Sequence, residues 1–235
     1  MPEPTSGVLL IDKPAGMTSH DVVARVRRAL DGARTGHAGT LDPFATGLLI
    51  VLVGKATKSQ QTMMALPKRY ETVAQLGASS STGDTEGEID QTGRLAPDPP
   101  NMPTGEVRQR PPIYSAVKVG GERAYKRARR GDHVQMPERI VSVHRFEQIW
   151  RRPDEQRPGL QQAGYEIECG SGTYVRSLIA DLGGDAYCLA LRRTAIGPFD
   201  VSDAVAPPER DSKWIDPPLI ALDDALAVLS RERQG

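Results

Sequence analysis

The 235-residue chain is poor in aromatic residues and cysteines and carries no net charge. Aromatic residues make up 5% of it, and the two cysteines, Cys169 and Cys188, have neither metal-ligand spacing nor the number needed for a disulfide framework. Because 30 basic residues balance 30 acidic ones, net charge does not indicate a nucleic-acid partner. No apolar run approaches the roughly 20 residues that span a bilayer, and no signal peptide is recognisable. We therefore expect a cytoplasmic protein that is not inserted in a membrane.

Several cofactor motifs are also missing. The sequence has no phosphate-binding P-loop, no dinucleotide-binding fingerprint and no Cys/His cluster. We therefore expect neither a bound metal nor any other cofactor.

Turn-forming residues and short apolar segments dominate what is present. The chain has 23 glycines and 19 prolines, which indicate many loops. Strands and helices alternate without regular βαβ order, so we expect an α+β fold with a mixed, largely antiparallel central sheet and flanking helices. Strands are predicted over 7–11, 48–53, 68–78, 139–150 and 164–169, and helices over 19–30, 56–66, about 174–182 and 219–233. Residues 79–110, rich in Ser, Gly, Pro and Asp, are predicted to be a surface excursion.

The segment 36–47, Gly-His-Ala-Gly-Thr-Leu-Asp-Pro-Phe-Ala-Thr-Gly, is the most informative one. It holds a single acid, Asp42, among three glycines, and Pro43 biases Asp42 toward an extended conformation. A predicted buried strand follows directly. A rigidly presented carboxylate suits a nucleophile or a general base. An aspartate that only caps a turn is the alternative, and the local residues leave both open.

Arg176 is a second candidate, at the edge of a predicted apolar helix stripe that begins at Val175. A cation in the first helical turn is disfavoured by the helix dipole by roughly 0.3–1 kcal/mol. A carboxylate partner would compensate, while a pair with Asp181 or simple solvation are the structural alternatives. Tyr70, on the predicted strand 68–78, is by itself ordinary core material.

Six segments, in chain order, resemble the motifs of the TruB family of tRNA pseudouridine synthases, which modify the T-loop uridine of tRNA. The family's pseudouridine synthase fold agrees with the predicted sheet. The matching segments are 7–16 with the following Thr18-Ser19, 36–47, 68–70, 111–118, 172–176 and 191–194.

The resemblance implies an isomerase that flips the uridine out, breaks its glycosidic bond and rejoins C1′ to C5. It places the catalytic aspartate at Asp42, the active-site tyrosine at Tyr70 and the partner of the aspartate at Arg176. Whether Asp42 attacks the sugar, attacks the base or removes a proton stays open. Arg176 would keep Asp42 ionised, and Tyr70 would stack on the base and handle the C5 proton.

The resemblance also implies contacts to RNA. It assigns them to His37, which would hold the loop from which the base is flipped, and to Tyr174, Leu191 and Lys13, of which Leu191 lines the uridine pocket. The predicted basic helix 121–131 and its neighbours add cations, among them Lys118 and Arg127, that suit a phosphate backbone. A solvated charged face is the alternative for this run.

The expected organisation is a catalytic domain over 1–205, with 79–110 as an insertion, followed by a helical tail over 206–235 in place of a complete PUA domain. The expected partner is the T-arm of tRNA, bound by a monomer. Three other functions are alternatives. One is an RNA-binding or tRNA-folding protein on the same scaffold, and another is a glycoside hydrolase, which normally needs two cooperating carboxylates. The third is a guide-RNA-dependent pseudouridine synthase, which the predicted absence of a PUA-like extension disfavours.

Overall fold

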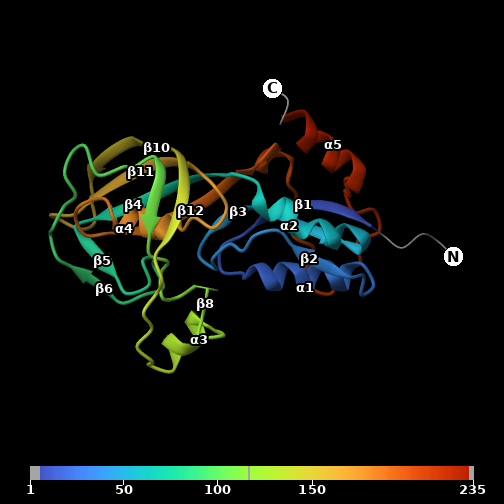
Figure 1. Ribbon diagram of the computed structural model, residues 1–235, viewed down its shortest axis with the longest axis horizontal. Helices are drawn as coiled ribbons and strands as arrows, with labels where there is room; N and C mark the ends of the chain where they lie inside the picture. The colour runs from blue at the N-terminus through green and yellow to red at the C-terminus, as the bar shows by residue number, and fades with distance from the viewer. Residues whose placement is uncertain (1–5, 116, 233–235) are drawn as a thin grey trace. The chain divides into compact units, whose positions relative to one another are not determined.

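The chain folds into two compact units. The computed structural model describes residues 6–115 and 117–232, with only the backbone for 125, 129, 231 and 232. One unit, here called the terminal unit, comprises residues 1–70 and 192–235; the other, the central unit, comprises residues 71–191. Strands β4 and β12 each run from one unit into the other along the chain (Figure 1).

The terminal unit contains both ends of the described chain. Its elements are β1 (Gly7–Lys13), α1 (Ser19–Ala29), β2 (Thr35–His37), β3 (Thr46–Val53), the 3₁₀ helix η1 (Gly54–Ser59), α2 (Gln60–Ala65), the start of β4 (Lys68–Leu76), the end of β12 (Ala186–Ile196), β13 (Phe199–Asp200), the 3₁₀ helix η2 (Val201–Asp203) and α5 (Leu222–Glu232).

The central unit contains mostly strands. Its elements are the rest of β4, then β5 (Ala78–Ser80), β6 (Ile89–Gln91), β7 (Gly105–Gln109), β8 (Lys118–Val119), β9 (Glu122–Arg123), α3 (Ala124–Arg129), β10 (Arg139–Pro153), β11 (Gln161–Cys169), α4 (Val175–Ala180) and the first part of β12.

Each unit is built on a sheet. In the terminal unit the strand order is β1-β3-β12, with β2 paired to β3 and β13 paired to β12. Strand β3 is antiparallel to β1 and parallel to β12. In the central unit the order is β12-β4-β11-β10-β7, and β10 is antiparallel to both of its neighbours. The predicted α+β fold with a mixed, largely antiparallel sheet is confirmed.

Strand β1 is buried on both faces, which explains its unbroken run of apolar residues. Val8 and Leu10 belong to the hydrophobic core that includes α2 and α5, whereas Leu9 and Ile11 belong to the core that includes α1. Because side chains alternate along a strand, each helix layer receives every second residue. Figure 1 shows α1 and α5 on the two sides of β1.

The C-terminal segment covers the outer edge of β1. The backbone of Val8 exchanges two hydrogen bonds with Ile220, at 2.8 and 2.9 Å. Val205 accepts from the N–H of Asp12 at 2.9 Å and donates to the carbonyl of Leu10 at 3.0 Å. The predicted C-terminal helix is present as α5 and packs on β1, while residue 233 lies outside the described residues.

Helix α1 begins where the sequence predicted. The Thr18 hydroxyl accepts from the N–H of Asp21 at 3.0 Å, and the Asp21 carboxylate accepts from the N–H of Thr18 at 2.8 Å. This capping box satisfies two amide groups that the first helical turn leaves unpaired. The helix ends at Ala29, one residue before the predicted end.

Other predicted elements differ in extent. Residues 54–59 are 3₁₀ rather than α-helical, and the basic helix is α3, shorter than the predicted 121–131 because Glu122 and Arg123 form β9. The excursion 79–110 contributes β6, β7 and the buried Asp84, so it is not purely a surface segment. Strand β12 was not predicted, because two arginines interrupt its apolar pattern. No helix in the described part of the chain has the length and apolar character needed to cross a membrane.

Candidate active site

The loop that carries Asp42 is fixed immediately before this residue. The N–H of Ala38 donates to the carbonyl of Ile50 at 2.9 Å. Leu41 is bound twice by Ser19, whose hydroxyl accepts from the Leu41 N–H at 2.9 Å and lies 3.1 Å from its carbonyl. Because these contacts are buried, they resist competition from water. Asp42 itself is half-buried and follows directly on this fixed backbone.

The loop is also fixed immediately after Asp42. The carbonyl of Pro43 accepts from the Gly16 N–H at 2.9 Å and from the Lys13 ammonium at 3.2 Å. Lys13 is fully buried, and its ammonium also donates to the carbonyls of Pro14 and Met17. An ammonium has three protons, and three carbonyls accept them here. Lys13 thus ties two loops together, and its predicted contact with RNA stays a prediction.

Gly47 closes the loop at a close crossing with β12. Its φ is +103°, a conformation that L side chains rarely adopt, and a Cβ there would lie 2.3 Å from the carbonyl oxygen of Arg193. The two residues face each other in the parallel pairing of β3 and β12. Only glycine fits this position.

Arg176 is buried in the central unit, with 3% of its side chain exposed. Its guanidinium lies 3.1 Å from the Asp84 carboxylate and donates to the carbonyls of Thr82 at 2.7 Å and Tyr114 at 3.0 Å. Asp84 accepts in turn from the Thr82 hydroxyl at 2.5 Å and the Glu86 N–H at 3.0 Å. A buried guanidinium surrounded in this way has a fixed orientation.

No sequence pattern singles out Asp84. It lies in a polar turn that resembles many solvated turns, and only its contact with a distant helix reveals its role. The alternative partner for Arg176, Asp181, forms no ion pair within the described residues. Asp42 belongs to the terminal unit and Arg176 to the central unit, and their pairing stays a prediction.

The remaining predicted uridine contacts lie on β4, β12 and at the start of α4. Tyr70 is half-buried on β4, and Leu191 is buried on β12. Tyr174 is half-buried, with its backbone N–H and carbonyl both bound by the Gln109 amide at 2.8 and 2.9 Å. The Arg139 guanidinium lies 4.7 Å from the centre of the Tyr174 ring. Tyr174 is therefore held through both its backbone and its ring.

His37 is held neutral at physiological pH. Burial lowers its pKa to about 4, helped by the charges of His20 and Arg193 and opposed by a hydrogen bond with the Gly39 backbone. Its ring packs edge-to-face against that of His20, with 5.4 Å between centroids. A neutral imidazole is suited to stacking against bases rather than to binding phosphate as a cation.

The basic run in the central unit is partly neutralised. Arg130 forms ion pairs with Glu122 at 2.6 Å and Asp132 at 3.0 Å, and Arg127 lies 3.6 Å from Asp132. Two acids, Glu122 within the run and Asp132 just beyond it, therefore neutralise part of its charge. Among the described side chains, the cations of this run without an ion-pair partner are Lys118, Arg123 and Lys126.

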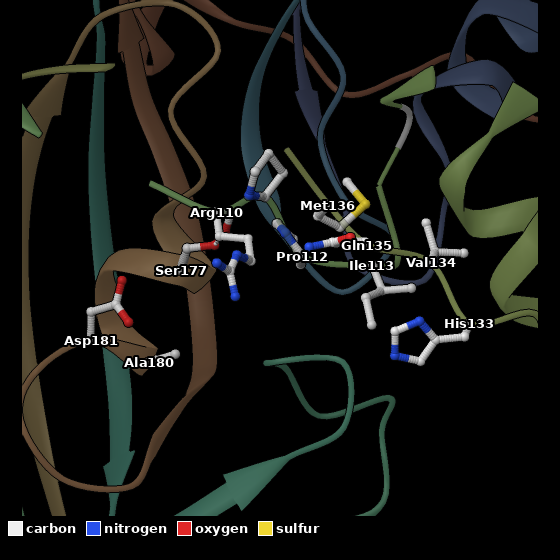
Figure 2. A pocket seen from close by; sticks show the side chains of 11 residues that line it. Arg110, Pro112, Ile113, His133, Val134, Gln135, Met136, Ser177, Ala180 and Asp181 are labelled. Carbon is white, nitrogen blue, oxygen red and sulfur yellow. Dashed lines mark hydrogen bonds between the residues drawn. The ribbon is translucent and has the colours of Figure 1, made fainter. Parts of the chain in front are cut away.

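A pocket of about 610 Å³ lies beside α4 in the central unit. Figure 2 shows Ser177, Ala180 and Asp181 along one wall, with His133 and its neighbours across from them. Partial burial raises the pKa of Asp181. Arg176 does not line the pocket, so this space is separate from the buried ion pair. In the described part of the chain, no group of three or more His, Cys, Asp or Glu side chains could hold a metal ion.

The Arg176–Asp84 pair leads to a prediction about stability. Asp84→Asn removes one charge of a buried ion pair, so we expect a loss of about 3–5 kcal/mol in the free energy of unfolding. Glu138→Gln, in the exposed pair with Arg110, should cost less than about 1 kcal/mol. Urea denaturation of the two variants measures this, and equal losses would contradict the prediction.

The low pKa of His37 leads to a second prediction. The unfolded chain binds more protons than the folded one between pH 6.5 and about 4, so stability is complete above pH 6.5 and falls as the pH drops toward 4. The contribution of His37 to this fall is at most about 3 kcal/mol. His37→Gln should flatten the pH dependence measured by urea denaturation, whereas the exposed control His144→Gln should not. An unchanged slope in His37→Gln would refute the assignment.

Sequence comparisons agree with the motif resemblance. A family model of the TruB family pseudouridylate synthases (N-terminal domain) matches residues 27–175. The chain is 45% identical over 225 residues to tRNA pseudouridine synthase B of Thermobifida fusca, covering 91% of this chain and 77% of the relative. It is 44% identical over 209 residues to the protein of the same name from Mycobacterium tuberculosis, covering 84% and 69%.

Solved structures with a similar fold also cover most of this chain. A chain of a Cbf5-Nop10-Gar1 complex superposes with a TM-score of 0.58 at 30% identity over 83% of this chain. A chain of an H/ACA RNP bound to a substrate RNA containing 2′-deoxyuridine gives 0.57 at 25% identity over 97%. This chain spans 50% and 56% of the length of these two neighbours. Because the family model covers more than half of it and its relatives reach this identity, the chain belongs to the TruB family of pseudouridylate synthases.

Proposed function

We propose that this protein converts the T-loop uridine of tRNA to pseudouridine. The observation that carries the proposal is the loop around Asp42, whose backbone is bound on both sides of this half-exposed carboxylate. Such a loop presents one acid in one orientation, as a nucleophile or general base requires. The relatives named tRNA pseudouridine synthase B supply the substrate class.

The reaction is an isomerisation. The N1–C1′ bond of the uridine breaks, a C1′–C5 bond forms, and the proton on C5 is lost while N1 gains one. We assign the carboxylate that starts this sequence to Asp42, acting on the sugar or on the base. Arg176 is assigned as the cation that keeps Asp42 ionised, because a guanidinium stays charged at any working pH. Tyr70 is assigned to stack on the base and to handle the C5 proton.

The base must leave its stack before it can react, at a cost of a few kcal/mol. The neutral ring of His37 supports a role in stacking against the loop that the base leaves. Leu191, buried on β12, and Tyr174, held by Gln109 and Arg139, are assigned to contacts with the uridine. An apolar and aromatic surrounding excludes water, which favours recapture of the detached base.

Two other functions compete with this one. A tRNA-binding or tRNA-folding protein on the same scaffold would bind RNA without turnover. The other is a guide-RNA-dependent enzyme, but identity to the chains from the Cbf5-Nop10-Gar1 complex and the H/ACA RNP is 25–30%, against 44–45% for the tRNA pseudouridine synthases. We therefore favour an enzyme that reads tRNA by itself. Because this single chain carries every residue assigned above, we further propose that it acts as a monomer, in the cytoplasm where tRNA is found.

The first test is tritium release from tRNA transcript labelled with [5-³H]uridine. Wild type should release tritium from the T-loop uridine, and Asp42→Asn should release none because its amide is neither a nucleophile nor a base. Both should bind the transcript similarly, as measured by filter binding. The matched control Asp203→Asn, an exposed acid of the same unit, should keep full turnover.

The outcomes separate the hypotheses. Turnover retained by Asp42→Asn would refute the role of Asp42. Absence of release from wild type, with tRNA still bound, would instead favour the RNA-binding function.

A second test concerns the unpaired cations of the basic run. Replacing Lys118, Arg123 and Lys126 by Gln should weaken tRNA binding and reduce the slope of log Kobs against log salt concentration by up to about 2–3, since each phosphate contact adds somewhat less than one. Anisotropy titrations at several salt concentrations measure the slope. As a control, the same change at three arginines already paired with acids, Arg94, Arg110 and Arg145, should alter it little. Equal slopes in both triple variants would contradict the prediction.

A further inference from the structure

Arg193 is a fully buried cation beside the Asp42 loop. The residue is 1% exposed and lies on β12. Its Nε donates to the carbonyl of Leu48 at 2.7 Å, and its two terminal nitrogens donate to the carbonyls of Gly39 at 3.2 Å and Thr40 at 3.5 Å. All three acceptors belong to the loop or to the first residues of β3.

The surroundings of this charge are unusual. Within the described residues, no carboxylate lies within 4 Å of the Arg193 guanidinium. Burying an ion without a counter-ion is costly, and only well-placed dipoles offset the cost. Here these dipoles are backbone carbonyls, so the guanidinium is stable only while the loop keeps its shape. By the same argument, the three hydrogen bonds from the guanidinium hold the loop in this shape.

The contacts span the loop from end to end. Gly39 and Thr40 precede Asp42 closely in the chain, and Leu48 follows it at the start of the buried part of β3. The backbone of Arg193 also meets Gly47 so closely that no side chain fits there. One residue therefore constrains both the entry and the exit of the segment that presents Asp42.

We propose that Arg193 is a positioning residue for the catalytic carboxylate. Its guanidinium does not act on the substrate; it holds the backbone on both sides of Asp42, and so places this side chain at the reacting atoms. This inference rests on the proposed function, because it concerns the rate of a step that Asp42 performs. A misplacement of about 1 Å at a reacting group costs about 100-fold in rate.

Two substitutions of Arg193 test whether its positive charge or the geometry of its hydrogen bonds matters. Arg193→Lys keeps the positive charge, but an ammonium cannot reproduce the planar, forked arrangement of guanidinium donors. Arg193→Gln removes the charge and keeps one amide donor. If positioning is the role, both variants should lose single-turnover rate, measured with enzyme in excess over labelled tRNA, by about 100-fold. Their Kd for tRNA should change less than about three-fold, since the surface that meets RNA is unaltered.

A matched control variant tests whether a loss of stability alone lowers the single-turnover rate. Leu229→Ala, on α5 of the same unit, creates a cavity in the core shared with β1 and is expected to lower stability by about 2–5 kcal/mol. None of the three hydrogen bonds from Arg193 to the loop and β3 involves Leu229. At a temperature where all variants are folded by circular dichroism, it should keep the wild-type single-turnover rate. A rate loss equal to that of the Arg193 variants would overturn the proposal.

Amide hydrogen exchange gives a readout that does not depend on turnover. In Arg193→Lys, exchange at residues 38–47 should speed up at least about ten-fold relative to wild type, with little change on β1 or α5. In Leu229→Ala the pattern should be reversed. Unchanged exchange at 38–47 in Arg193→Lys would overturn the proposal even if the rate fell.

The outcomes also distinguish this proposal from the function on which it rests. No tritium release by wild type would refute the proposed function, whereas wild-type release together with full activity in both Arg193 variants would refute positioning alone. If neither Arg193 variant folds while Leu229→Ala does, Arg193 is required for the fold as a whole and the positioning role is overturned.

Discussion

Buried cations need oxygen partners, and in this protein backbone carbonyls of loops supply most of them. Most carbonyls within helices and sheets are already paired, so loops offer most of the free ones. Lys13, Arg176 and Arg193 are each buried, and each binds two or three loop carbonyls. A loop that surrounds a cation loses its freedom to rearrange. The segments expected to do chemistry are therefore rigid although they are neither helix nor strand.

This principle operates separately in each unit. In the terminal unit, Lys13 and Arg193 bind the loop of Asp42 from its two sides. In the central unit, Arg176 binds the turn of Asp84, and α4 is too short to hold this arginine by helical structure alone. The hydrophobic cores set where the strands lie, and the cations then set the conformation of the loops between them.

The sequence predicted the features that depend on neighbouring residues and missed those that depend on distant ones. Strands β1 and β3, the capping box of α1 and the prominence of Asp42 all follow from local patterns. Asp84 was missed because a polar turn looks solvated until a cation from another element lies against it. Strand β12 was missed because Arg193 breaks the apolar run expected of a buried strand, and only carbonyl partners elsewhere in the chain make its burial tolerable. The roles assigned to Tyr70, Tyr174 and Leu191 came from family resemblance, and their burial is compatible with them.

The pairing of the C-terminal segment with β1 bears on solubility. A strand at the edge of a sheet offers unpaired amides and carbonyls to any other strand it meets, including the same strand of a second molecule. Here Ile220 and Val205 occupy those groups, and the carbonyl of Ile220 lies so close to Gly7 that a side chain there would displace it. The C-terminal segment thereby prevents this edge from pairing with the same edge of a second molecule. A chain shortened before Val205 would expose a highly apolar strand edge, and it would be prone to self-association even if every residue of the Asp42 loop were intact.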